Sequence, residues 1–123
     1  MMVLVDTSVW VDHFRNDNHA LRRMLDSGSV LCHPFVIGEL ACGNLRNRRV
    51  ILDLLDALPC ALVAQNLEVL RLVEERRLFG QGLGWIDMHL MASALLQNFP
   101  LWTLDKSLRL AAIRVGVSFG AIT

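Results

Sequence analysis

Cysteine is scarce in this chain, and its few copies follow no ligand pattern. Cys32, Cys42 and Cys60 are the only cysteines among 123 residues, without a CxxC or Cys/His arrangement. An odd number at such wide spacing predicts neither a disulfide framework nor a zinc site. We therefore expect three buried free thiols in a reducing cytosol.

Long hydrophobic runs are also missing, although 54% of the residues are hydrophobic and the mean hydropathy is +0.42. No apolar stretch approaches the roughly 20 residues that span a bilayer. The N-terminus lacks a basic segment followed by a long apolar core, so no secretory signal is expected. These absences predict a cytoplasmic protein, and we interpret the hydrophobic excess as a surface for a protein partner. The length and the lack of a linker or repeat predict one domain over residues 1–123.

A net charge is absent as well, because 12 acidic side chains balance 12 basic ones. Neutrality argues at first against a nucleic-acid partner. If four acids gather in one pocket, however, eight remain to face the 12 basic groups, and the outer surface becomes basic. Lys106 is the single lysine, and the planar guanidinium groups of the arginines suit phosphate and RNA bases. Ordinary ion pairs on helix surfaces explain any one arginine equally well.

Short apolar runs alternate with helical periodicity, which predicts an α/β fold with a mainly parallel sheet. Helices are expected to fill the gaps between strands, with an amphipathic one over 46–58 and a largely buried one over 85–96. The expected strands are 2–5, 29–32, 60–64, 101–104 and a weak 116–119. The other expected helices are 8–15, 19–26, 34–42 and 67–78.

Acidic residues follow two of the predicted strands. Asp6 comes directly after the apolar run 2–5, and Asp105 comes after 101–104, each before a predicted helix. Ligands of an open parallel sheet bind at the carboxyl ends of its strands, so the two carboxylates are expected to converge. Each is also a favourable N-cap, and taken singly the cap explains it.

Two further acids lie in helices that are otherwise apolar. Glu39 is the single charge within 35–41, and Asp87 lies in the first turn of the helix expected over 85–96. A carboxylate in such a helix has to be paired, exposed at an edge or bound to a cation. Together with Asp6 and Asp105, these acids predict an oxygen-rich site for Mg²⁺ or Mn²⁺ and a candidate nuclease.

Four segments of the chain resemble, in order, the acidic motifs of PIN-domain ribonucleases. They are LVDTSVW with Asp6, GEL with Glu39, WIDMHL with Asp87 and LWTLDK with Asp105. Their length and spacing are similar to those of VapC-type toxins of toxin–antitoxin pairs, and the resemblance covers the whole chain. It implies a three-layer α/β/α sandwich with a mainly parallel central sheet. It also implies a Mg²⁺-dependent endoribonuclease, usually a homodimer, inhibited by a cognate antitoxin whose C-terminal segment lies across the site.

Phosphodiester hydrolysis needs an attacking hydroxide and charge relief at the phosphoryl and leaving oxygens, and a divalent ion assists with each. We expect Asp6 and Asp87 to bind the metal directly, and Asp105 to bind it directly or through water. Glu39 is expected to orient or deprotonate the attacking water. This chemistry leaves a 5′-phosphate and a 3′-hydroxyl.

Other polar residues near these acids are weaker candidates. Ser8 and Thr103 either orient the neighbouring carboxylates or touch the scissile phosphate, unless they act only as capping and strand residues. The cluster of Arg46, Arg48 and Arg49 is the expected contact with the RNA backbone.

The histidines and tryptophans predict less about function. The four histidines share no metal-ligand spacing, and His89 is expected to be a packed residue of an apolar helix. Trp10, Trp85 and Trp102 could stack on RNA bases, but each lies in a segment with core character and is expected to be structural.

Other functions are open on these residues. A housekeeping PIN-type nuclease of RNA maturation would carry the same acids. A non-catalytic α/β binding domain would use them only as helix caps, and metal affinity separates the two because caps bind no ion. Phosphoaspartate enzymes fit less well, since Ser8 stands where the haloacid-dehalogenase pattern has a second Asp.

Overall fold

The computed structural model describes residues 1–120. Three short parallel strands form the central sheet of the fold. The strands are β1 (Val3–Val5), β2 (Val30–Leu31) and β3 (Leu101–Trp102), in the spatial order β2-β1-β3. β1 pairs with both neighbours and is buried along its whole length. A strand buried on both faces is typical of a parallel sheet covered by helices.

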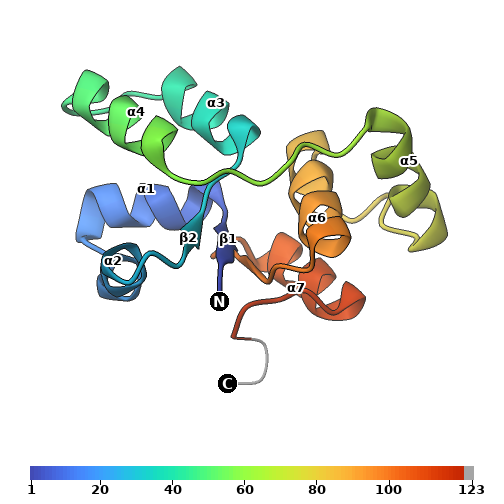
Figure 1. The fold of residues 1–123 in the computed structure, drawn as a ribbon. Coiled ribbons are helices and arrows are strands. Elements are labelled where there is room, and N and C mark those ends of the chain that lie inside the picture. The colour runs from blue at the N-terminus through green and yellow to red at the C-terminus, as the bar shows by residue number, and fades with distance from the viewer. Residues whose placement is uncertain (121–123) are drawn as a thin grey trace.

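Helices cover both sides of this sheet (Figure 1). In this view α1 and α2 lie on one side of the strands and α6 and α7 on the other, with α3 and α4 above them. The chain therefore crosses from one side of the sheet to the other between β2 and β3. This arrangement confirms the predicted α/β fold with a parallel central sheet. The helices are α1 (Thr7–Asn16), α2 (His19–Asp26), α3 (Pro34–Cys42), α4 (Arg48–Ala57), α5 (Asn66–Glu75), α6 (Trp85–Gln97) and α7 (Lys106–Val115).

Two of the predicted strands are reduced to single bridges. The segment 60–64 contributes one parallel bridge, between Cys60 and Cys32, and the segment 116–119 contributes one bridge to β3. In the first case, side chains of α6 bond the backbone N–H and carbonyl of Leu62. Those backbone groups are therefore occupied, and the strand does not extend beyond the bridge.

The core agrees with the prediction for α6 and departs from it for α4. The middle of α6, residues 88–94, is buried throughout, as expected. In α4 only Leu55 is buried, while Val50 is 58% and Leu54 is 61% exposed. The core thus buries only part of the apolar face of α4, and the remaining apolar side chains lie at the surface.

The cysteine expectation was wrong in part. Cys32 is buried, but Cys42 and Cys60 are exposed. Cys42 is the last residue of α3, and Cys60 follows the proline that comes after α4. Both thiols lie at the ends of elements, where hydrophobicity alone does not ensure burial.

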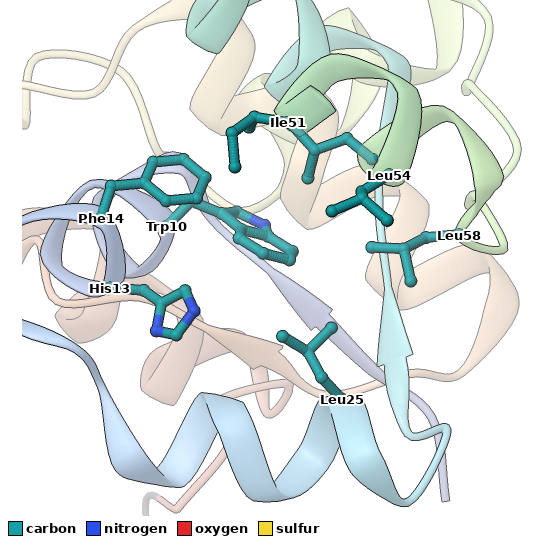
Figure 2. Close-up of a pocket in the computed structure, with 8 residues that line it drawn as sticks. Trp10, His13, Phe14, Leu25, Ile51, Leu54 and Leu58 are labelled. Atoms are coloured by element: carbon teal, nitrogen blue, oxygen red, sulfur yellow. The ribbon is translucent and has the colours of Figure 1, made fainter. Parts of the chain in front are cut away.

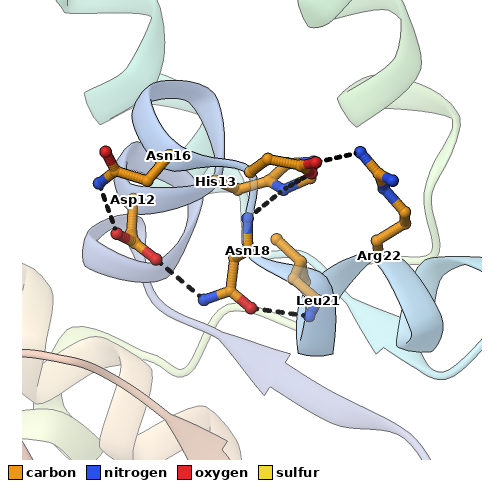
Figure 3. A network of polar contacts seen from close by, with 7 residues as sticks. Asp12, His13, Asn16, Asn18, Leu21 and Arg22 are labelled. Atoms are coloured by element: carbon orange, nitrogen blue, oxygen red, sulfur yellow. Dashed lines mark hydrogen bonds and ion pairs between the residues drawn. The ribbon is translucent and has the colours of Figure 1, made fainter.

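A polar network fixes the turn between α1 and α2 (Figure 3). Asp12 accepts hydrogen bonds from the side chains of Asn16 (2.9 Å) and Asn18 (3.0 Å), and these bonds lower its pKa. The Asn18 side chain also caps α2, and its backbone N–H donates to Nδ1 of His13 (3.2 Å). The turn passes through Asp17, which has a positive φ of 59°. α1, whose other end carries site residues, is therefore held firmly against α2.

None of the helices within residues 1–120 is long and apolar enough to cross a membrane.

Candidate active site

Asp6 is the most buried of the four predicted acids, with 5% of its surface exposed. It follows β1 and caps α1, and its Oδ2 accepts hydrogen bonds from three donors. These are the Ser8 backbone N–H (3.4 Å), the Ser8 hydroxyl (2.7 Å) and the Thr103 hydroxyl (2.7 Å). Two hydroxyls and one amide thus fix the orientation of this carboxylate.

The same hydroxyls join the carboxyl ends of β1 and β3. Thr103 accepts the backbone N–H of Asp105 (3.0 Å), and Ser8 accepts the backbone N–H of Leu104 (2.9 Å). The chain leaves these two neighbouring strands towards helices on opposite sides of the sheet, the position where α/β folds form ligand crevices. Ser8 and Thr103 therefore do orient Asp6, one of the two roles that the sequence left open.

Each of the other three acids also uses one oxygen in the fold. Oδ1 of Asp105 accepts the N–H of Leu108 (3.0 Å) and caps α7, while Oδ2 of Asp87 accepts the N–H of Gly84 (2.9 Å). Oε1 of Glu39 accepts the hydroxyl of Thr7 (2.6 Å). In each of the four carboxylates one oxygen accepts these hydrogen bonds, and the second oxygen accepts no hydrogen bond from residues 1–120.

The four acids lie close enough to share one electrostatic field. Burial is the largest cause that raises the pKa of Asp87, and the charges of Asp6, Asp105 and Glu39 raise it further. The N–H of Gly84 acts in the opposite direction. Asp87 is thus the acid in this group whose charged form the fold supports least well.

The donor set fits a hard divalent cation. Carboxylate oxygens with one free position each are the ligands that Mg²⁺ and Mn²⁺ prefer, and Mg²⁺ commonly retains several waters. In the part of the chain that the structure describes, no three His, Cys, Asp or Glu side chains are already drawn together as a metal cluster. The spread carboxylates therefore suit a cation held partly through water better than a closed, all-protein cage.

A groove of about 760 Å³ opens beside Glu39, between α1, α3 and the loop that precedes α4. Arg15 and Arg46 line it together with Glu39. Of the arginines predicted to contact RNA, Arg46 faces this groove and Arg49 is exposed, but Arg48 donates to the backbone carbonyls at the end of α3. The guanidinium of Arg48 is thus engaged in closing α3.

Sequence reasoning gave no role to two residues near the acids, Thr7 and Arg15, and favoured a structural role for a third, Trp85. Thr7 orients Glu39, and its position directly after Asp6 was the available signal. Arg15 lines the groove, but it lies far from Glu39 in the sequence, so no local pattern pointed to it. Trp85, expected to be structural, is 44% exposed at the start of α6, two residues before Asp87, and its ring centroid lies 4.8 Å from that of buried His89.

A second hollow, of about 290 Å³, is apolar (Figure 2). Side chains of α1, α2 and α4 form it, among them Trp10, Phe14 and Leu54. None of the four acids lines it. Its chemistry suits apolar side chains of a protein rather than a phosphate backbone.

Comparisons with known proteins agree with this geometry. The family model of the PIN domain matches residues 3–114. Two curated proteins, each named Ribonuclease VapC32, from the Mycobacterium tuberculosis strains CDC 1551 / Oshkosh and ATCC 25618 / H37Rv, are similar to the chain. Each is 48% identical over 118 residues, which cover 95% of this chain and 95% of the relative.

Proposed function

The chain belongs to the PIN-domain family, and on this premise we propose that it is a metal-dependent endoribonuclease and the toxin of a toxin–antitoxin pair. The observation that carries the proposal is the set of four carboxylates, each oriented by one oxygen and open at the other. The name and the high identity of the two relatives support RNA as the substrate. We infer that residues 1–123 act as one nuclease domain.

In this proposal Asp6, Asp87 and Asp105 hold Mg²⁺, or Mn²⁺ in its place. When bound, the cation would lower the pKa of water and neutralise charge on the phosphoryl oxygens. Asp6 needs no reorganisation to take part, because Ser8 and Thr103 already fix its orientation. Burial, and after it the like charges of the other three acids, raise the pKa of Asp87, and a bound cation would favour its charged form.

Glu39 is proposed to take the proton of the attacking water. Its Oε1 is held by Thr7, which leaves Oε2 to act as the base. The side chain is exposed beside the groove that Arg15 and Arg46 line, so an RNA backbone in that groove would pass the base. Water attack at phosphorus, without use of the 2′-hydroxyl, breaks the P–O3′ bond, and the 3′-oxygen leaves. The products are a 5′-phosphate and a 3′-hydroxyl.

Helix capping alone does not account for this site. Helix capping accounts for the hydrogen bonds to one oxygen of Asp6 and one oxygen of Asp105. A hydrogen bond from the backbone accounts for one oxygen of Asp87. Glu39 caps no helix, and a domain whose acids served only as caps would gain nothing from placing three other charges around Asp87. These two features favour a nuclease over a non-catalytic domain.

We propose that the antitoxin packs apolar side chains into the hollow of Figure 2 and that its C-terminal segment lies across the acids, because Phe14 and Ile51 line both this hollow and the groove beside Glu39. Leu54 at its rim is 61% exposed, and covering such a surface with apolar side chains would be favourable. Leu62, Leu67 and Leu70 form a separate exposed apolar group around α5, which we propose as the homodimer contact. A PIN nuclease of RNA maturation would need neither an antitoxin partner nor inhibition by one.

The test is cleavage of structured and unstructured RNA by purified protein, with Mg²⁺ or with EDTA. Asp6→Asn is the site variant, and Asp53→Asn, an exposed acid on α4, is the matched control. We expect discrete fragments with 5′-phosphate ends from the wild type and the control in Mg²⁺ only, and none from Asp6→Asn. Cleavage that persists in EDTA or in folded Asp6→Asn would refute the assignment.

A further inference from the structure

Cys32 and Cys60 are direct partners in the single bridge that joins the segment 60–64 to the end of β2. The Cys32 N–H donates to the Pro59 carbonyl (2.8 Å), and its carbonyl accepts the N–H of Ala61 (2.8 Å). Residues paired across neighbouring strands are about 4.8 Å apart, with side chains on the same face. Disulfides need Cα atoms about 4.4 to 6.8 Å apart, so this pair meets the requirement.

The two thiols differ in their exposure to solvent. Burial is the main cause that raises the pKa of Cys32 to about 12, and it also raises the pKa of Cys60. The Cys32 thiol donates to the carbonyl of His33 (3.9 Å). Cys60 is exposed, whereas Cys32 is fully buried. An oxidant can therefore reach Cys60 first, and Cys32 is its partner across the bridge.

We propose that Cys32 and Cys60 form a redox modification site, in which a peroxide converts the two thiols into an intramolecular disulfide. In the first step the Cys60 sulfur attacks the peroxide O–O bond, giving Cys60 sulfenic acid and, from hydrogen peroxide, one water. In the second the Cys32 sulfur attacks the Cys60 sulfur, the S–S bond forms, and hydroxide leaves with the Cys32 proton as a second water. The two sulfurs lose two electrons, which reduce the peroxide, and a dithiol reductant reverses the change.

The cross-link would close the part of the chain that contains α3 and α4 into a ring. Glu39 lies within that ring, as do the residues of the groove that belong to the loop before α4. A ring of this length restricts the unfolded chain, and we expect the melting temperature of the oxidised protein to rise by roughly 10 °C. The site does not depend on nuclease activity.

Mass spectrometry of Cys42→Ser tests the proposal, because this variant retains only the two thiols in question. The purified protein is treated with hydrogen peroxide at pH 8.5, where more thiolate is present than at neutral pH. Trypsin cuts after Arg23, Arg46, Arg49 and Arg71 and so separates Cys32 from Cys60. We expect an intact mass lower by two hydrogens and a reducible peptide pair, 24–46 joined to 50–71.

Cys42→Ser with Cys60→Ser is the control, and it changes an exposed side chain, so it should fold. It should show no loss of two hydrogens and no rise in melting temperature after peroxide. The proposal is overturned if folded Cys42→Ser gives no joined peptides, if Cys60 proceeds only to sulfinic acid, or if the joined peptides come only from covalent dimers. Formation of the disulfide with no change in melting temperature would overturn the ring as a stabilising element.

Discussion

Asp87→Asn should make the protein more stable when no divalent cation is present. Burial and three neighbouring carboxylates disfavour the charged form of Asp87, whereas the N–H of Gly84 favours it. Asparagine removes the charge but keeps an oxygen that accepts the Gly84 N–H. The substitution therefore relieves the repulsion while it preserves the start of α6.

The magnitude follows from these opposing effects. An exposed charge pair contributes about 0.2–1 kcal/mol, and three repulsive neighbours act on Asp87. The favourable interaction of a carboxylate with a helix N-terminus is about 0.3–1 kcal/mol and is lost in the variant. The difference is about 1 kcal/mol in favour of asparagine, which corresponds to roughly 3–5 °C in the melting temperature for a chain of this length.

Thermal melts in EDTA, at low and at high salt, measure this difference. Asp53→Asn is the control and should stay within about 0.5 kcal/mol of the wild type, because Asp53 is an exposed surface acid. The raised pKa of Asp87 contributes stability at pH below its unfolded value of 3.8, and this contribution is lost as pH rises through the folded pKa. The gain from asparagine should therefore vanish near pH 3.

Magnesium should reverse the ranking of the two proteins. At a cation concentration ten times its dissociation constant, binding stabilises the wild type by about 1.4 kcal/mol, while Asp87→Asn gains less. A variant that melts lower than the wild type in EDTA, together with no effect of Mg²⁺ on either protein, would refute the idea that the four acids form one site.

Three further predictions test single residues. Thr7→Val should lower kcat about 10-fold and leave metal affinity within twofold, because the Thr7 hydroxyl only orients Glu39. Thr7→Ser keeps the hydroxyl and should restore the rate. An equal loss of kcat in Thr7→Ser would contradict this role. Burial lowers the pKa of His33 to about 4. The neutral imidazole therefore contributes fully to stability above pH 6.5, and this contribution is lost as the pH falls from there through about 4. The melting temperature of His33→Gln should lack this dependence on pH. Trp85→Leu should raise KM for single-stranded RNA by roughly 5- to 100-fold with little change in kcat, because base stacking on the exposed indole supports binding. An unchanged KM would mean that Trp85 has another role.

The fold was predictable where local signals and burial coincide. The apolar run before Asp6 became β1, Pro34 begins α3 as expected, and the apolar helix near Asp87 is buried. The segment 60–64 has the composition of a strand but forms one bridge, because side chains of α6 bond its backbone. That competition is tertiary, and no local pattern reveals it.

The neighbourhood of the four acids was predictable for a topological reason. Asp6 and Asp105 follow strands that pair in parallel, so their positions are set by the sheet. The orientation of Glu39 was not predictable in the same way, since it depends on a hydroxyl 32 residues away. The exposure of single side chains was harder still to predict. Trp85 and Leu54 are apolar residues in regular helices, and only the packing of the whole chain leaves them at the surface.

Capping and metal binding are compatible roles for these acids, although the sequence presents them as alternatives. A carboxylate has two oxygens, and Asp6, Asp87 and Asp105 each bond the fold through one of them. The bonded oxygen fixes the direction of the second, so the cap provides the orientation that a ligand needs before a cation arrives. An asparagine at these positions keeps the bonded oxygen and removes the charge. Loss of cleavage in a folded Asp6→Asn would therefore report on the chemistry of the site and not on the start of α1.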